Sequence, residues 1–118
     1  MTPRKTPLPG ETVRGSTTGR PLMAALDLLG RRWALRMLWE LRFGPLGARA
    51  LRSRCDDMSP SVLYARLGEL AEAGLIRQDT AGGYQLTEHG LALERALRPL
   101  DAWSRKWAAQ GPGRPVPE

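Results

Sequence analysis

Apolar residues recur at helical spacing through most of the chain. After Pro21, which suits the first turn of a helix, this spacing predicts a short helix that Gly30 interrupts. A second helix is predicted over 31–43 and ends at Gly44. Its apolar arc spans about 240°, which is too wide to face a single core. We therefore expect this helix to be covered on two sides, by its own domain and by something else.

A short helix, a tight turn and a longer helix follow along the chain. The short helix is predicted over 46–54, with Ala50 and Leu51 facing inward. The longer helix is predicted over 59–73, because Ser59 is a good N-cap residue. This order of elements is typical of a helix-turn-helix.

Two short strands, 75–79 and 84–86, are predicted next, and the turn Thr80–Gly83 joins them into a hairpin. A hairpin directly after the second helix of a helix-turn-helix is the wing of a winged helix. The pattern therefore predicts a mainly α fold with a small β-hairpin, a winged helix-turn-helix.

The last predicted helix begins after Thr87, a good N-cap residue, and runs to about residue 109. Pro99 lies inside it and is expected to kink or split it. One face of this helix carries its largest apolar residues, Leu100, Trp103 and Trp107. Because the helix projects from a small domain, we expect a second subunit to cover this face, which gives a dimer through the first, second and last helices.

The charge is unevenly distributed along the 118 residues. Eighteen Lys and Arg stand against twelve Asp and Glu, a formal net charge of +6, which favours a polyanionic partner such as nucleic acid. Half of that excess lies in residues 1–20, which we expect to form a disordered basic tail. Residues 111–118 are rich in Pro and Gly and are expected to be disordered too. The folded domain is therefore placed at 21–110.

Several function classes are disfavoured. Cys55 and His89 are the chain's one cysteine and one histidine, too few for the usual four-ligand zinc site, and no metal or cofactor is expected. No nucleophile elbow or Gly-rich phosphate loop occurs, so no catalytic residues are assigned. No apolar run has the length of a membrane helix. We expect a cytoplasmic protein without a membrane partner.

The pattern resembles the HxlR family of winged-helix transcription regulators. The matching stretches are Ala25–Ala34, Leu38–Pro45, Met58–Leu67, Glu69–Ile76, Leu86–Gly90 and the tail of Leu100, Trp103 and Trp107. Together they cover about 21–108, and their order and spacing are more specific than any single piece. The resemblance implies a homodimer, with the first and last helices at the interface, that binds an operator of two half-sites.

Three features depart from the family pattern. Arg20 stands where many members have a cysteine, so an oxidant-sensing role is not carried over to that position. The wing turn, Thr80–Gly83, is short. The second helix of the helix-turn-helix, usually rich in Lys and Arg, offers Arg66 alone.

The expected DNA-contacting residues lie on the two helices of the helix-turn-helix and on the wing. They are Arg49, Arg52, Ser59, Ser61, Tyr64, Ala65, Arg66, Arg77 and Thr80. Hydroxyls and arginines can bind phosphate or base edges, and alanine can contact a thymine methyl group. The alternative is a solvated surface on which Tyr64 packs on the protein and Arg66 pairs with Glu69 or Glu40.

A second candidate site combines aromatic and aliphatic residues of the second and last helices. It consists of Leu35, Trp39, Leu100, Trp103 and Trp107. These side chains form either a dimer core or, in addition, a pocket for a flat aromatic effector. Cys55 is interpreted as an inert buried thiol, with a redox sensor as the alternative, and His89 as exposed.

The sequence thus predicts a homodimeric, sequence-specific DNA-binding transcription regulator, with control by a small aromatic effector as an open possibility. The alternative is a winged helix that has lost strong DNA binding and serves as a ligand-binding or protein-interaction module. The almost uncharged recognition helix and the short wing motivate that alternative.

Overall fold

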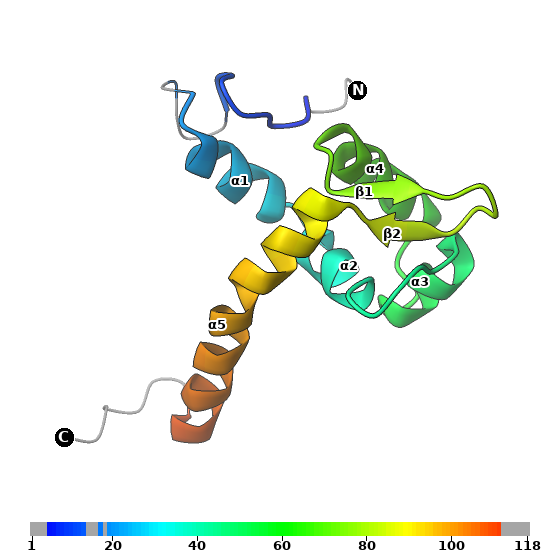
Figure 1. Ribbon diagram of the computed structural model, residues 1–118. Coiled ribbons are helices and arrows are strands. Elements are labelled where there is room, and N and C mark those ends of the chain that lie inside the picture. Colours follow the sequence, from blue (N-terminus) through cyan, green and yellow to red (C-terminus); the bar gives the residue numbers. More distant parts are fainter. Residues whose placement is uncertain (1–4, 14–16, 18, 112–118) are drawn as a thin grey trace.

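The computed structural model describes residues 5–13, 17 and 19–111. Within these ranges the chain is mainly helical with one antiparallel hairpin (Figure 1). The elements in chain order are α1 (Pro21–Leu29), α2 (Ala34–Glu40), α3 (Ala48–Arg54), α4 (Pro60–Glu72), β1 (Ile76–Gln78), β2 (Tyr84–Leu86) and α5 (Glu88–Gln110).

The break between α1 and α2 is sharper than predicted. Trp33 has a left-handed backbone, with φ of 75°, directly before α2. The predicted helix over 31–43 was therefore too long, because residues 31–33 turn the chain and α2 is limited to Ala34–Glu40. A left-handed non-glycine residue costs about 1–2 kcal/mol, so tertiary packing must hold Trp33 in place. After α2 the chain turns again and reaches Gly44, which has φ of 140°.

A β-bridge ties the segment before α3 to the hairpin. The Leu46 amide donates to the Tyr84 carbonyl at 2.9 Å, and the Tyr84 amide donates to the Leu46 carbonyl at 2.7 Å. Leu46 is thus extended rather than helical, and α3 begins at Ala48, later than predicted. Leu51 is fully buried as expected, but Ala50 is exposed, so its predicted inward orientation was wrong.

The helix α4 has the predicted caps. The Ser59 hydroxyl accepts a hydrogen bond from the Val62 amide at 3.3 Å, and Pro60 occupies the first helical position. Gly74, with φ of 79°, follows the helix and ends it in the left-handed conformation that favours glycine. The three leucines at helical spacing on α4 are buried: Leu63, Leu67 and Leu70.

The hairpin is short, and side-chain hydrogen bonds close its turn. Ile76 pairs with Leu86 in the antiparallel register, and both side chains are buried. Asp79 closes the turn, because its Oδ1 accepts from the amides of Ala81 at 2.9 Å and Gly83 at 2.8 Å. Because successive side chains of a strand point to opposite faces and Ile76 points inward, Arg77 points outward and is exposed.

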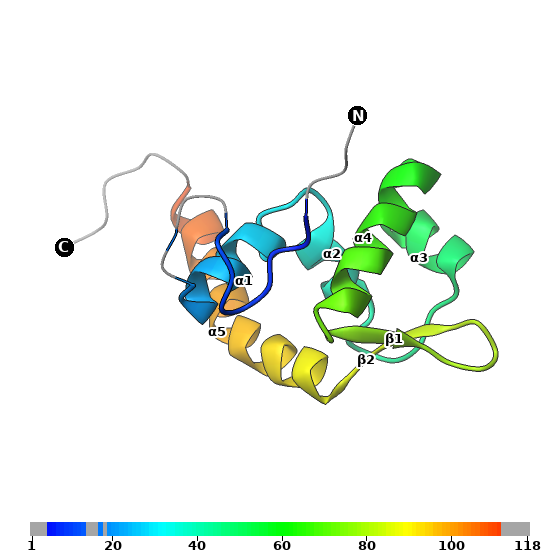
Figure 2. The same cartoon turned by 90° about the horizontal axis from the view of Figure 1, so that it is seen from above.

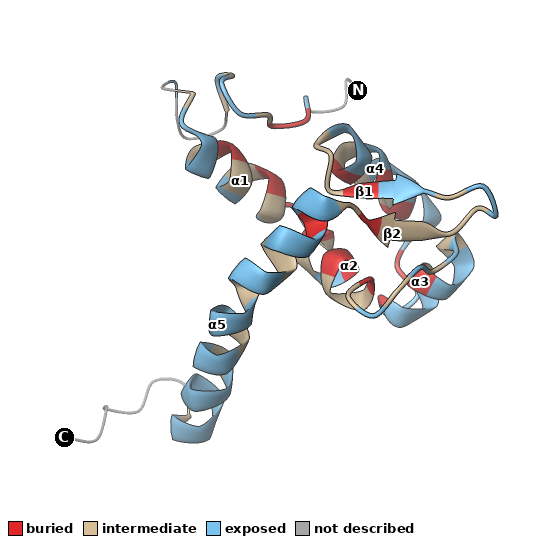
Figure 3. Cartoon of the chain, viewed as in Figure 1, coloured by how far each residue is buried: buried red, intermediate tan, exposed pale blue. Residues whose placement is uncertain are grey.

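The long helix α5 leaves the domain. It begins at the Thr87 cap, whose Oγ1 accepts from the Gly90 amide at 3.2 Å. Pro99 does not split it, so the helix continues to Gln110. Figure 3 shows its second half almost wholly exposed, and Gly90 is its one buried residue among those described.

All helices but α5, together with both strands, supply the core. Its buried members are Leu28, Ala34, Met37, Leu38, Leu41, Leu51, Cys55, Met58, Leu63, Leu67, Leu70, Ile76 and Leu86. This core holds α4 and the hairpin in a fixed relation, which is what a DNA-binding surface requires.

Part of the N-terminal segment packs against the domain. Residues 5–13 run beside α1 (Figures 1 and 2), and Thr6 and Pro7 are buried. The domain bounds expected from the sequence, with a disordered tail over 1–20, stay a prediction. Residues 1–4, 14–16, 18 and 112–118 lie outside the described part of the chain.

Candidate nucleic-acid interface and dimer face

The first turns of α4 expose a serine, a tyrosine and an alanine. Ser61, Tyr64 and Ala65 are exposed, and the Tyr64 side chain does not pack away, since 58% of the residue is accessible. The Ser59 and Ser61 hydroxyls lie 2.9 Å apart and share a hydrogen bond. This outward face is opposite the buried leucines, as expected for a helix that contacts bases with its N-terminal residues.

Of the two arginines of α3 that are expected to contact DNA, Arg52 is engaged within the described part of the protein and Arg49 is free there. Arg52 donates from Nε to the Met58 carbonyl at 2.6 Å and so braces the turn between α3 and α4. Arg49 is exposed and has no hydrogen bond or ion pair within the described ranges. Arg49 and Tyr64 line a shallow hollow of about 200 Å³ between the two helices. The structure thus brings these two predicted contact residues together.

Arg66 has partners within the protein. Its Nη1 donates to Glu69 Oε1 at 2.7 Å, and its Nε donates to the Arg32 carbonyl at 2.8 Å. Only 19% of its side chain is exposed. The first contact is the pairing with Glu69 that the sequence left open, and the second connects α4 to the turn before α2.

The wing carries two further predicted contacts. Arg77 on β1 and Thr80 at the turn are both exposed, and neither has a side-chain partner within the part of the chain that the structure describes. In Figures 1 and 2 the hairpin turn points away from the free half of α5. The hairpin turn and the free half of α5 therefore lie on opposite sides of the domain.

The projecting helix bears a stacked pair of tryptophans. The rings of Trp103 and Trp107 lie 5.4 Å apart between centroids with an interplanar angle of 14°. They are 56% and 50% exposed, and Leu100 on the same face is 51% exposed. On α1, Leu22 and Leu26 are exposed as well. Large apolar side chains gathered on projecting helices mark an interaction surface.

A hollow of about 230 Å³ lies between α2 and α5. Its apolar walls include Leu35, Trp39 and Leu100, so three of the five predicted residues of this site come together. Trp103 and Trp107 do not line it. The wide apolar arc of α2 is thus covered on one side by the core and faces this hollow on the other. Sequence reasoning missed the two rim residues of opposite charge, Arg36 and Asp101.

A helix-turn-helix family model matches residues 28–112, under the description HxlR-like helix-turn-helix. The chain belongs to the HxlR-like helix-turn-helix family. The match spans α2 to α5 and the C-terminal part of α1. It confirms the family expected from the sequence and the winged helix-turn-helix fold.

Two relatives from Bacillus subtilis (strain 168) are similar along most of this HxlR-like chain. One is described as the uncharacterized HTH-type transcriptional regulator YvaP, 28% identical over 89 residues that cover 70% of this chain and 82% of the relative. The other is the HTH-type transcriptional regulator YodB, 26% identical over 103 residues that cover 82% of this chain and 92% of the relative.

Solved structures agree with that assignment. Quinone-bound YodB from B. subtilis superposes with a TM-score of 0.68 at 28% identity, covering 73% of this chain and 96% of that chain. A transcriptional regulator described as MarR family from Enterococcus faecalis V583 gives a TM-score of 0.67 at 26% identity, with 83% and 94% covered. The HxlR-like protein is therefore a transcription regulator of the helix-turn-helix type, and such regulators bind DNA.

In this HxlR-like protein the single cysteine is inaccessible. Cys55 ends α3, is 0% exposed and belongs to the core. Burial raises the pKa of its thiol, and the nearby Arg36 guanidinium offsets part of that rise. A thiol of raised pKa has little thiolate at neutral pH, which agrees with the inert interpretation. His89 is exposed on the first turn of α5.

The described ranges contain neither a membrane-spanning helix nor a cluster of metal ligands. No helix there is long and apolar enough to cross a bilayer. Within the same ranges no group of three or more His, Cys, Asp or Glu is arranged to hold a metal ion.

Proposed function

We propose that the protein acts as a homodimer that binds two DNA half-sites through α4 and the hairpin. The observation that carries this proposal is the separation of surfaces: exposed polar groups on α4 and the hairpin, and exposed leucines and tryptophans on α1 and α5. A transcription regulator acts on the chromosome, so the proposed location is the cytoplasm. We assign the protein no catalytic function.

The residues proposed to support DNA binding fall into three groups, of which two contact DNA and one acts indirectly. Ser61, Tyr64 and Ala65 lie where base edges would be reached, and Ser59 caps the helix beside them. Arg49, Arg77 and Thr80 would contact phosphates, because they are exposed and have no partner within the described ranges. Arg52 and Arg66 would act indirectly by holding the turn and α4, since their guanidinium groups already donate to carbonyl groups of the protein.

The proposed dimer face consists of Leu35, Trp39, Leu100, Trp103 and Trp107, with Leu22 and Leu26 from α1. Burying these side chains against a second copy is supported by their size and exposure, since apolar burial contributes about 25 cal/mol per Å². A two-fold dimer repeats α4 once in each subunit, and binding of two half-sites requires both copies to face the same side of the assembly.

Control by a small aromatic effector is part of the proposal. Its support is the relative YodB, which has been solved bound to quinone. The hollow between α2 and α5 could hold a flat ring. It also borders the proposed dimer face, so we assign it first to the interface between subunits.

The direct test is binding of the full chain to double-stranded DNA from the region upstream of its own coding sequence. A gel shift at low salt should show a complex that survives competition by unrelated DNA. Absence of any complex at low salt, where phosphate contacts are strongest, would refute DNA binding and favour the ligand-binding or protein-interaction alternative.

A further inference from the structure

A buried arginine lies below the N-terminal segment. Arg31 belongs to the turn between α1 and α2, and only 3% of its side chain is exposed. Its Nη1 donates to the Glu69 carboxylate, and its Nη2 donates to the Lys5 carbonyl at 2.6 Å. Its Nε has no hydrogen-bond partner within the described ranges. A buried donor without an acceptor is unfavourable, so an acceptor that reaches Nε would be bound.

The unpartnered nitrogen lies on a specific edge of the guanidinium group. Nε and Nη2 direct their N–H bonds in parallel, and this edge matches the two oxygens of a carboxylate. The Lys5 carbonyl supplies a single oxygen, which serves Nη2 alone. A carboxylate in its place would serve both nitrogens, and it would exchange one hydrogen bond for two.

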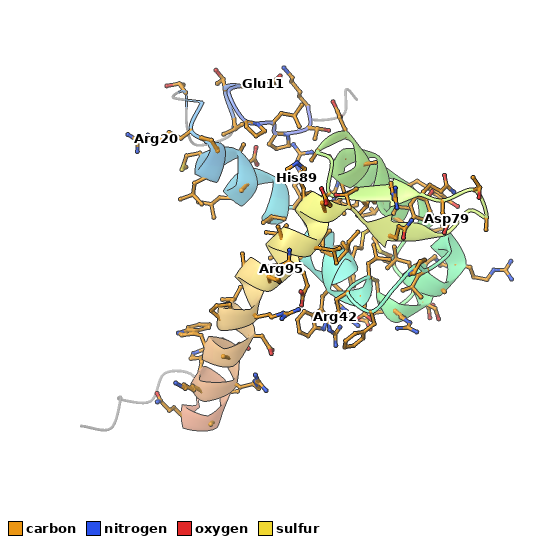
Figure 4. All side chains as sticks on the ribbon, viewed as in Figure 1. Glu11, Arg20, Arg42, Asp79, His89 and Arg95 are labelled. Carbon is orange, nitrogen blue, oxygen red and sulfur yellow. The ribbon has the colours of Figure 1, made fainter. Side chains whose placement is uncertain are left out.

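A hollow of about 430 Å³ lies between the N-terminal segment and α1, and Arg31 is one of its lining residues. This volume is within the range of about 300–1,000 Å³ typical of small-molecule sites. Pro7 and Val13 are its apolar lining residues, and Thr12, Asp27 and Arg31 are among its polar ones. Asp27 already has an interaction of its own, and the Lys5 ammonium group, 75% exposed, pairs with Glu11 at 3.0 Å. Figure 4 shows Glu11 on this segment beside α1.

We propose that this hollow binds a small organic acid with an apolar body. Nε and Nη2 of Arg31 donate to its carboxylate, the Lys5 carbonyl is displaced, and the apolar body lies between Pro7 and Val13. Such an acid would be an effector of this regulator, so the site extends the proposed function. The regulatory role of the site rests on that function, whereas binding of the acid does not.

The site connects to the DNA-binding helix through ionic contacts. Glu69 on α4 accepts from Arg31 and also from Arg66, at 2.7 Å for the latter. A carboxylate bound at Nε and Nη2 shares the Arg31 guanidinium with Glu69, and it therefore alters the ion pair that supports α4. By linkage, acid binding and operator binding must then change each other's affinity by the same factor.

The test is a titration of the ¹⁵N-labelled full chain with benzoate, followed by the arginine Nε–H resonances in NMR spectra. We expect the Arg31 resonance to shift saturably with benzoate and to remain unchanged with neutral benzamide. Arg31→Lys should weaken benzoate binding about tenfold, since it loses the paired donors. The matched control Arg32→Lys, an exposed neighbour, should bind normally.

A second variant keeps the proposal testable if Arg31→Lys does not fold. Asp27→Asn removes a negative charge from the wall of the hollow and should tighten benzoate binding. No saturable shift at Arg31, equal shifts at all arginines, or unchanged affinity in Asp27→Asn would each overturn the site.

A final comparison repeats the titration with operator DNA present. Unequal benzoate affinities with and without DNA support the coupling, and equal affinities refute it. Benzoate binding without DNA binding would contradict the proposed function, whereas DNA binding without benzoate binding would contradict the acid site alone.

Discussion

Gly90 on the first turn of α5 lies so close to the Leu75 carbonyl that a Cβ at this position would overlap the oxygen. The backbone of α5 therefore approaches the end of the α4–β1 connection directly, and the Leu86 side chain lies close to the same position. This close approach anchors the start of the projecting helix and sets its direction relative to α4.

Gly90→Ala should accordingly destabilise the protein. We expect a loss of about 1–3 kcal/mol in the free energy of unfolding, because the added methyl group forces the backbone apart. The matched control is Gly68→Ala, a helical glycine with open space around its Cβ position, which should gain about 0.5–1 kcal/mol. Urea unfolding at one protein concentration measures both, and equal stability of the two variants would contradict the close approach.

Glu69→Gln should be strongly destabilising. It removes the carboxylate that pairs with the buried Arg31 and with Arg66, and an uncompensated buried charge costs about 3–5 kcal/mol. Glu72→Gln, on the exposed side of the same helix, should change the free energy of unfolding by less than about 0.5 kcal/mol. Thermal unfolding compares them, and similar melting temperatures for both variants would refute the role of Glu69.

The tryptophans of α5 should control assembly. Trp103→Ala combined with Trp107→Ala removes the largest side chains of the proposed dimer face and should yield a folded monomer. Phe43→Ala serves as control, because Phe43 is 84% exposed on the turn after α2 and lies outside that face. Sedimentation equilibrium gives the mass directly. A double variant that sediments like the parent protein would show that the face lies elsewhere.

The Cys55 thiol should make stability fall at alkaline pH. Burial raises its pKa in the folded protein, so above about pH 8.5 the unfolded chain loses the thiol proton first and gains stability relative to the fold. The free energy of unfolding should therefore decline as pH rises past that point. Cys55→Ala should remove this part of the decline, and an identical pH profile for the variant would contradict it.

The elements that local pattern specifies were predictable, and contacts between distant segments were not. The caps at Ser59 and Thr87 and the buried leucines of α4 follow from spacing and hydrogen-bonding chemistry alone. The bridge between Leu46 and Tyr84 shortened α3, because it pairs the backbone amide and carbonyl groups of two residues far apart in the sequence. Local helix propensity contains no information about such a pairing.

In the candidate site too, features set by the local pattern were predictable and contacts between distant segments were not. The exposed face of α4 followed from its helical period, whereas the orientation of Arg66 depended on where Glu69 and the Arg32 carbonyl come to lie. Nothing in the local pattern near Lys5 indicated that its carbonyl would meet a buried arginine 26 positions away.

The central claim is that α4 and the hairpin bind DNA, and the salt dependence of operator affinity tests it most directly. Fluorescence anisotropy across a range of salt concentrations should give a linear fall of log affinity with log salt. Arg49→Ala and Arg77→Ala should each weaken binding and reduce the slope by about one unit. Arg95→Ala is the control, since Arg95 is exposed on α5, away from Asp79 at the hairpin turn (Figure 4). Unchanged affinity and slope in an Arg49/Arg77 double variant would contradict the account.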